Sequence, residues 1–249
     1  VSRGLGDVYK RQGDWSGRIV SLLPVTWVQD WPIPGEVLPQ NIGTMKWDGK
    51  IPFKHTEKLS IKRSDDFDED CLAPQWQWNY QPRKDYFSLT ERPGWLRLKA
   101  YRPLETNNLL KAGNTLTQRT FRKQNNDVTI KMDISNMQDG QKNGLCHFSS
   151  QHSAIGIVKE EDACYLEYRK NGNITKGIQI HSEFVWFRTE WGMDGKSQYY
   201  YSLDGDNFLP FGEKYQLTWG NYRGDRIGIY CFNDKKETGS VDVDYCHYR

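Results

Sequence analysis

The sequence predicts an all-β protein built as an antiparallel β-sandwich. In residues 128–134 every second residue is apolar and the residues between them are polar, which is the period of a strand with one buried face. The same alternation recurs in residues 95–99, 164–169, 185–190 and 241–245. Asp-Gly or Asn-Gly pairs, which suit tight hairpin turns, stand at 139–140, 171–172, 194–195 and 204–205. Many strands, regular turns and no helical pattern indicate two antiparallel sheets packed face to face.

The composition narrows the range of partners. Hydrophobic residues make up 37% of the chain and charged residues 27%, as in a folded protein with a well-solvated surface. The net charge is +2 and no Lys/Arg run with interleaved aromatic residues is present, so a nucleic-acid partner is not expected. No apolar stretch reaches about 18 residues, so a membrane partner is not expected either. A neutral polymer fits this charge balance.

The five cysteines indicate buried thiols. They are far apart, odd in number and show no CxxC spacing, which argues against a zinc site or a complete disulfide framework. Free cysteines are common core residues, although one pair can be bridged if the protein is exported. These residues are Cys71, Cys146, Cys164, Cys231 and Cys246.

Two segments precede the predicted sandwich. Residues 1–12 have neither the apolar core of a signal peptide nor amphipathic periodicity, and we expect a non-native leader that hides the true start and any export signal. The compartment is therefore not predicted. Residues 13–63 are rich in Trp, Pro and Gly, and the prolines exclude long helices. We interpret residues 13–63 as the last strands of a larger domain plus a linker, and residues 64–249 as the sandwich.

The acidic run at 65–70 raises the question of a calcium site. Its acidic spacing resembles an EF-hand loop, but Cys71 stands at position six in place of Gly and Gln77 at position twelve in place of Glu. One interpretation is a solvated acidic turn. The other is a structural Ca²⁺ shared between the first and last strands, with the carboxylate ligands Asp66, Asp68, Asp242 and Asp244.

No catalytic residue is predicted within the chain. Residues 160–162 form a Glu-Glu-Asp charge run typical of a surface turn. The histidines do not form HxxxH or HExxH, and no GxSxG or Gly-rich phosphate loop is present. Residues 202–208, SLDGDNF, resemble the Asp-box hairpin of β-propeller proteins, in which Asp and Gly fix a turn.

An aromatic row is the strongest candidate for a sugar contact. Trp76, Trp78 and Tyr80 are spaced by two, so on a strand their rings face one side, where indole can stack on the apolar face of a sugar. Gln77 or Asn79 would then bond hydroxyl groups at the edge. The alternative is that Trp76 and Trp78 belong to the sandwich core.

Several longer segments together resemble one family. They are SDDFDEDCLAPQWQWNYQP, FSLTERPGWLRLKA, LLKAGNTLTQRTF, YYYSLDGDNFLPFG and VDVDYCHYR, and they extend over nearly all of residues 64–249. Together they resemble the C-terminal concanavalin A-like domain of glycoside hydrolase family 43 β-xylosidases and α-L-arabinofuranosidases. The upstream segment GRIVSLLPVTWVQDWPIPG is similar to the end of that family's five-bladed catalytic propeller. The resemblance implies a jelly-roll sandwich preceded by an extended remnant of a propeller.

The resemblance also implies a function. The family hydrolyses xylosyl or arabinosyl linkages with inversion, using carboxylates on the propeller, upstream of residue 13. Whether the chain counts as an enzyme is thus left open, since it lacks those carboxylates. In relatives the sandwich packs on the propeller, and a loop carrying an aromatic residue helps close the pocket. The matching loop is 111–118, with Leu116 where some relatives have Phe.

Three roles follow from these expectations. As an accessory domain, the sandwich stabilises the propeller and shapes its pocket for xylo- or arabino-oligosaccharides, with Trp78, Asn79, Leu116 and Arg119 as pocket-side residues. As an independent module, it binds xylan or arabinan through the aromatic row that starts at Trp76. As a structural domain, it only mediates protein contacts.

Overall fold

The computed structural model describes residues 14–17, 23–44, 46–49, 61–220 and 223–249. In this part of the chain strands dominate, and the helices are three short 3₁₀ turns, η1 (Pro39–Asn41), η2 (Lys84–Tyr86) and η3 (Leu109–Lys111). Within the same residues, no helix has the length and apolar character needed to cross a membrane. The all-β prediction is confirmed, while the leader predicted at residues 1–12 lies outside the described residues.

One layer of the sandwich is an antiparallel sheet of seven described strands. Its central strands are long and its edge beside β8 is short. In spatial order the strands are β13 (Asn173–Ile180), β12 (Ala163–Lys170), β11 (His152–Glu160), β10 (Gln141–Phe148), β18 (Arg226–Asn233), β8 (Thr115–Arg119) and β5 (Gln77–Trp78).

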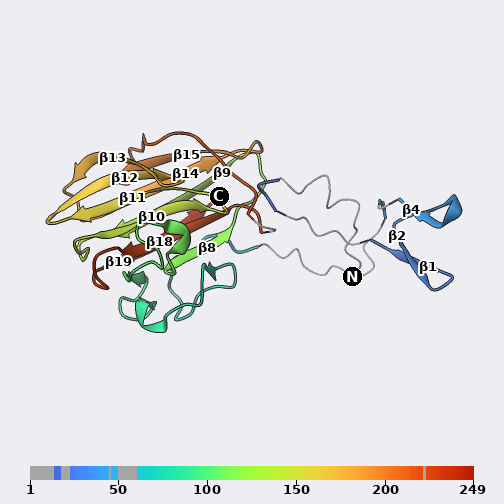
Figure 1. Ribbon diagram of the computed structural model, residues 1–249, viewed down its shortest axis with the longest axis horizontal. Helices are drawn as coiled ribbons and strands as arrows, with labels where there is room; N and C mark the ends of the chain where they lie inside the picture. The colour runs from blue at the N-terminus through green and yellow to red at the C-terminus, as the bar shows by residue number, and fades with distance from the viewer. Residues whose placement is uncertain (1–13, 18–22, 45, 50–60, 221–222) are drawn as a thin grey trace.

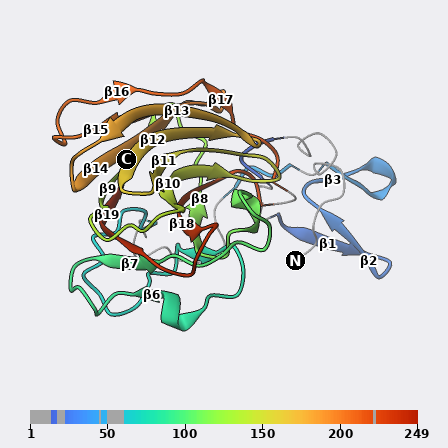
Figure 2. The same cartoon turned by 60° about the vertical axis from the view of Figure 1, so that its left-hand side comes forward.

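The other layer is an antiparallel sheet of eight described strands, seven of them along its main path. Figures 1 and 2 show the two sheets stacked face to face. The order is β16 (Leu209–Pro210), β15 (Lys196–Ser202), β14 (Phe184–Trp191), β9 (Asn126–Asp133), β19 (Ser240–Tyr248), β7 (Leu96–Lys99) and β6 (Phe87–Ser88), and β17 (Tyr215–Gln216) pairs with β15.

The core lies between the two sheets. The alternating apolar side chains of β9, among them Ile130 and Met132, are fully buried against those of the opposite sheet, such as Ile155 and Ile229. Burial of each such side chain contributes about 1.5–3 kcal/mol. The antiparallel sandwich predicted from the two-residue period is therefore confirmed, since one large apolar cluster joins both layers.

The predicted turns also occur where the sequence places them. Asn171 and Gly172 connect β12 to β13, and their φ angles of 49° and 90° are those of a two-residue hairpin turn of the I′ type. The turn at 204–205 follows β15, and there the carboxylate of Asp204 accepts hydrogen bonds from the backbone N–H groups of Asp206 and Asn207. These bonds and the Asn207 side chain lower the pKa of Asp204, which is the structural role expected for this hairpin.

All five cysteines are free, and Cys146, Cys231 and Cys246 are buried as predicted. The prediction of burial is wrong for Cys71, which is exposed, and Cys164 is only half-buried. Burial raises the pKa of Cys231 to about 12 and that of Cys146 further still, so neither is a thiolate at neutral pH.

Two small hairpins precede the sandwich. Strands β1 (Val25–Val28) and β2 (Trp31–Pro34) form one, and β3 (Val37–Leu38) and β4 (Ile42–Gly43) form the other, on the right of Figure 1. These strands are short, as the prolines predict. Ile33 is buried within them, whereas Trp31 is 73% exposed.

Residues 14–17 pack on the sandwich itself. Trp15 is buried in the main core cluster, and its carbonyl oxygen accepts a hydrogen bond of 2.7 Å from the backbone N–H of Asp225. Gly195 adopts a φ of +70°, and a Cβ there would lie 2.4 Å from Nε1 of Trp15. The turn after β14 therefore needs glycine both for its backbone and for its contact with the indole ring.

We predict that Trp15→Ala lowers the free energy of unfolding by about 3–5 kcal/mol, because a buried indole leaves a cavity. Trp31→Ala is the matched control, since that ring is exposed and its loss should change stability by at most about 0.5 kcal/mol. Chemical denaturation followed by tryptophan fluorescence and circular dichroism measures both. Equal effects of the two substitutions would show that residues 14–17 do not belong to the folded sandwich.

Candidate functional site

A cleft of ≈ 540 Å³ lies at the short edge of the seven-stranded sheet. It is formed by β5, β8 and β18 together with Ile61 and Lys62, through which the chain enters the sandwich. Its polar lining consists of cations and amides. These are Lys62, Gln75, Gln77, Gln118, Arg119, Arg223 and Arg226.

Arg226 is the buried cation of this set. Only 8% of it is exposed, and its Nε donates a hydrogen bond of 2.9 Å to Oγ1 of Thr117. Arg119 is its cross-strand partner in the register of β8 and β18, and Arg223 is close by. Burial, with the charges of Arg223 and Arg119, lowers the pKa of Arg226 to about 10. The cleft therefore concentrates positive charge that remains present at neutral pH.

Arg119 and Gln77 are the sequence-predicted residues that line this cleft, and both are exposed. Trp76, Trp78, Asn79 and Leu116 are not part of its lining. Trp76 is 8% exposed, its Nε1 donates a hydrogen bond of 2.7 Å to Oδ2 of Asp65, and its ring stacks on Phe67. The indole thus fills the end of the core while its N–H finds a buried acceptor.

Trp78 is half-buried, packs against the same core and contacts the ring of Phe87 at 4.7 Å between centroids. Tyr80 is exposed. Trp76 and Trp78 do lie on one side, as their spacing predicts, but that side is the core. The structure thus corrects the interpretation of Trp76, Trp78 and Tyr80 as an open row of stacking rings.

Asn79 and Leu116 have structural contacts. The side-chain nitrogen of Asn79 donates hydrogen bonds to the carbonyl oxygens of Leu110 and Ala112, at 3.1 and 3.0 Å, and so fixes the turn around η3. Leu116 has no exposed surface and belongs to the core. The structure corrects its expected place at a pocket mouth: residues 115–119 are strand β8, and alternation turns Leu116 inward.

The four carboxylates considered for calcium are not brought together. Asp66 accepts a hydrogen bond from Nε2 of His247 or pairs with it at 2.7 Å, and Asp68 is exposed. Asp244 pairs with Nζ of Lys131 at 2.7 Å, while Asp242 is held by two arginines. Among the residues that the structure describes, no group of three or more His, Cys, Asp or Glu can hold a metal ion. Calcium binding by these residues stays a prediction.

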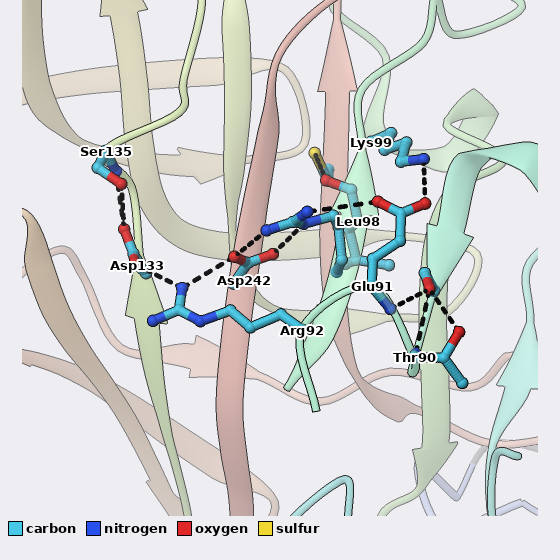
Figure 3. A network of polar contacts seen from close by, with 11 residues as sticks. Thr90, Glu91, Arg92, Leu98, Lys99, Asp133, Ser135 and Asp242 are labelled. Carbon is cyan, nitrogen blue, oxygen red and sulfur yellow. Dashed lines mark hydrogen bonds and ion pairs between the residues drawn. The ribbon is translucent and has the colours of Figure 1, made fainter. Parts of the chain in front are cut away.

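Asp242 is the centre of a buried ion-pair network, which Figure 3 shows from close by. Arg97 binds its two oxygens at 2.7 and 2.8 Å, a bidentate geometry that raises the pKa of this guanidinium. Nη1 of Arg92 bridges Asp242 and Asp133 at 2.9 and 2.7 Å. The sequence alone does not predict this network. Arg97 and Asp242 are far apart in the sequence and become neighbours only through the pairing of β7 with β19.

We predict that Asp133 makes the stability pH-dependent at acid pH. Burial alone would raise its pKa, but hydrogen bonds from Ser135 and the charge and hydrogen bond of Arg92 outweigh it and lower the pKa. A depressed carboxyl pKa contributes stability that is present above the unfolded value of about 3.9 and is lost as pH falls through the lower folded value.

Urea titrations between neutral pH and strongly acid pH measure this contribution. Asp133→Asn should be less stable than the unsubstituted protein at pH 7, and its stability should fall less below about pH 4. Asp70→Asn is the control at an exposed position. An Asp133→Asn profile parallel to that of the unsubstituted protein over the whole range would contradict the assignment.

A second groove, of ≈ 960 Å³, lies along the outer side of β11, β12 and β13. Tyr165, Val158 and Ile174 supply its apolar surface. Three of its carboxylates are paired with cations: Glu160 with Lys176 at 2.5 Å, and Glu167 with Arg169 and Asp234 with Lys142 at hydrogen-bonding distance. Glu161 and Asp162 form the exposed turn that the charge run predicts.

These features define a concanavalin A-like jelly-roll sandwich with two grooves, in which the large groove carries ion-paired carboxylates. Residues 64–249 match the family model of the β-xylosidase C-terminal concanavalin A-like domain, and the chain belongs to this domain family of glycoside hydrolase family 43.

Similar proteins are longer than this chain. A β-xylosidase of Formosa agariphila is 34% identical over 255 residues, which cover 94% of this chain and 43% of that protein. A non-reducing end α-L-arabinofuranosidase of Bacteroides ovatus is 34% identical over 91 residues, 33% of this chain and 15% of that protein. A solved structure of a bifunctional GH43-CE protein from Bacteroides eggerthii is 28% identical with a TM-score of 0.75, covering 94% of this chain and 31% of that one. The chain thus spans less than half the length of these relatives.

Proposed function

We propose that this chain is the accessory sandwich of a glycosidase that releases xylosyl or arabinosyl units from hemicellulose, and that it packs on a catalytic propeller domain. The observation that carries the proposal is the family match over residues 64–249, in a chain that corresponds to 43% of the β-xylosidase it resembles. Inverting hydrolysis needs a carboxylic acid and a carboxylate held across the scissile bond, and the proposal assigns both to the propeller.

The charges in the large groove support this division of labour. Glu160, Glu167 and Asp234 each form an ion pair with a lysine or an arginine. Glu161 and Asp162 are exposed on the turn between β11 and β12. The arrangement therefore favours a binding or structural role for this groove over proton transfer.

The hairpins that precede the sandwich support a neighbouring domain. Trp27 and Trp31 are 69% and 73% exposed, and Ile42 is exposed on the adjoining hairpin. Large apolar side chains gathered in one short segment are typical of a surface that a partner covers. The cleft beside Ile61 and Lys62 lies where the chain passes from this segment into the sandwich, so we expect Arg119 to be the pocket-side residue among those proposed.

We predict that the 249-residue chain alone does not release 4-nitrophenol from aryl β-xylosides or α-L-arabinofuranosides, whereas the enzyme with its catalytic domain does. In a two-polypeptide assay, Trp27→Ser/Trp31→Ser should weaken association with the catalytic domain by about 30-fold or more, because buried Trp side chains at interfaces commonly contribute ~2 kcal/mol or more. Isothermal titration calorimetry gives the Kd.

Leu104→Ser is the matched control, since Leu104 is an exposed apolar residue on a loop of the sandwich. The Kd of this variant for the catalytic domain should equal that of the unsubstituted chain. Turnover by the chain alone would contradict the proposal, and so would a Leu104→Ser defect as large as that of the double variant.

The alternative function is an independent carbohydrate-binding module. The large groove with Tyr165 on its wall favours it, because a long hollow on a sheet face can receive a polysaccharide chain. Affinity electrophoresis separates the two: retardation of the isolated chain by soluble xylan or arabinan, lost in Tyr165→Ala, supports the module. Unchanged mobility supports the accessory role.

A further inference from the structure

The cleft at the β5–β8 edge has a surplus of positive charge. In the part of the chain that the structure describes, Arg119, Arg223 and Arg226 form no ion pair with a carboxylate. Lys62 has only a marginal contact, 4.0 Å from Oδ1 of Asp65. Elsewhere in the sandwich arginines meet acids directly, as Arg97 does with Asp242. Single arginines without a carboxylate partner also occur elsewhere, such as Arg188, which donates to Thr129. The cleft differs in gathering three such arginines at one place.

Arg226 shows the physical cost of this arrangement. The residue is 8% exposed, and its Nε and Nη2 donate hydrogen bonds to the hydroxyl and carbonyl oxygens of Thr117. A guanidinium has five N–H donors, so several donors remain for another acceptor. A buried cation next to two others is destabilising unless an anion completes the set. The lowered pKa of Arg226 reflects the same imbalance.

The neutral groups of the cleft restrict the kind of anion. The side chain of Gln77 is exposed at the rim, and Oε1 of Gln75 is a buried acceptor without a hydrogen-bond partner in the described structure. Phe121 adds an aromatic surface, which is covered on one side by the guanidinium of Arg63 at 5.3 Å. Amides that bond hydroxyl groups, an aromatic wall and guanidinium groups together suit a ring that carries both hydroxyls and a carboxylate.

The size of the cleft agrees with such a ligand. Its volume of ≈ 540 Å³ is within the ~300–1,000 Å³ typical of small-ligand sites. A single carboxylate side chain from a neighbouring domain would fill only part of it. A sugar acid can instead place its carboxylate on the arginines and its hydroxyls on the amides.

We propose that this cleft binds a hexuronic acid, as a carboxylate-bearing side group on the hemicellulose chain whose hydrolysis the proposed function assigns to the enzyme. The inference rests on that proposed function for the polymer class. Arg119 and Arg223 contact the carboxylate, Arg226 supplies the buried charge behind it, and Gln77 selects for hydroxyl groups.

The test uses the intact 249-residue chain and three probes: glucuronic acid, glucose as the neutral match, and inorganic phosphate as a non-sugar anion. Ligand binding is followed by calorimetry or by chemical-shift changes in NMR. We expect glucuronic acid to bind at least about tenfold more tightly than glucose, because charge-assisted hydrogen bonds dominate. The affinity for glucuronic acid should fall as salt is added.

Arg119→Gln/Arg223→Gln tests the assignment, because both side chains are exposed and the fold does not depend on them. The double variant should lose about tenfold or more of the affinity for glucuronic acid. Arg102→Gln/Lys236→Gln is the control for net charge, because it also removes two positive charges and both residues are exposed and lie outside the cleft. Gln77→Ala should lower the affinity for glucuronic acid and leave the affinity for phosphate unchanged.

Each other outcome overturns the inference. Equal binding of glucose and glucuronic acid removes the role of charge, and equal binding of phosphate and glucuronic acid removes the role of the sugar ring. If the double variant instead weakens docking of the catalytic domain while glucuronic acid binding is unaffected, the cleft is a domain contact. These failures leave the proposed accessory function intact, because that function is tested by association through Trp27 and Trp31.

Discussion

The two sheets share one core only if every strand presents its apolar side chains to the same side, and β19 shows how strictly this constraint acts. Val241 and Val243 face the core at the start of the strand, whereas Cys246 and Tyr248 face it at the end. The parity changes because a β-bulge at Asp244 inserts one extra residue against β9. Without the bulge, the second half of the strand would turn its polar face inward.

The same constraint determines where charge can be placed. Residues that alternate away from the core form the outer faces, and there the sandwich joins its strands by ion pairs: Arg97 and Asp242 are cross-strand neighbours on β7 and β19. Asp242 is almost fully buried, so removal of either partner would leave an uncompensated charge. Electrostatic pairing thus supports the register that the apolar pattern selects, and neither acts alone.

Much of the fold could be predicted because its signals are local. Alternation and Gly-containing turns lie within single strands or hairpins, and they indicated the sandwich correctly. The site could not be predicted in the same way. The cleft joins Arg119 to Arg226, which become neighbours only through the register of β8 and β18. The two-residue spacing predicts that Trp76 and Trp78 lie on the same side of a strand, but it does not predict that this side faces the core. For Leu116 the family resemblance was misleading. It suggested a loop at the mouth of a pocket, whereas the residue lies within β8 with its side chain in the core.

The two arginine environments of this sandwich explain why the cleft stands out. At the β7–β19 pair the guanidinium of Arg97 has both oxygens of a carboxylate, and its pKa is raised. At the β8–β18 pair the guanidinium of Arg226 has hydroxyl and carbonyl acceptors and two cationic neighbours, and its pKa is lowered to about 10. Both are cross-strand positions in which an acid would fit the pairing rules. A cross-strand pair of two arginines, with a third close by, departs from the opposite-charge pairing seen at β7 and β19, and such departures are expected where binding has priority over stability.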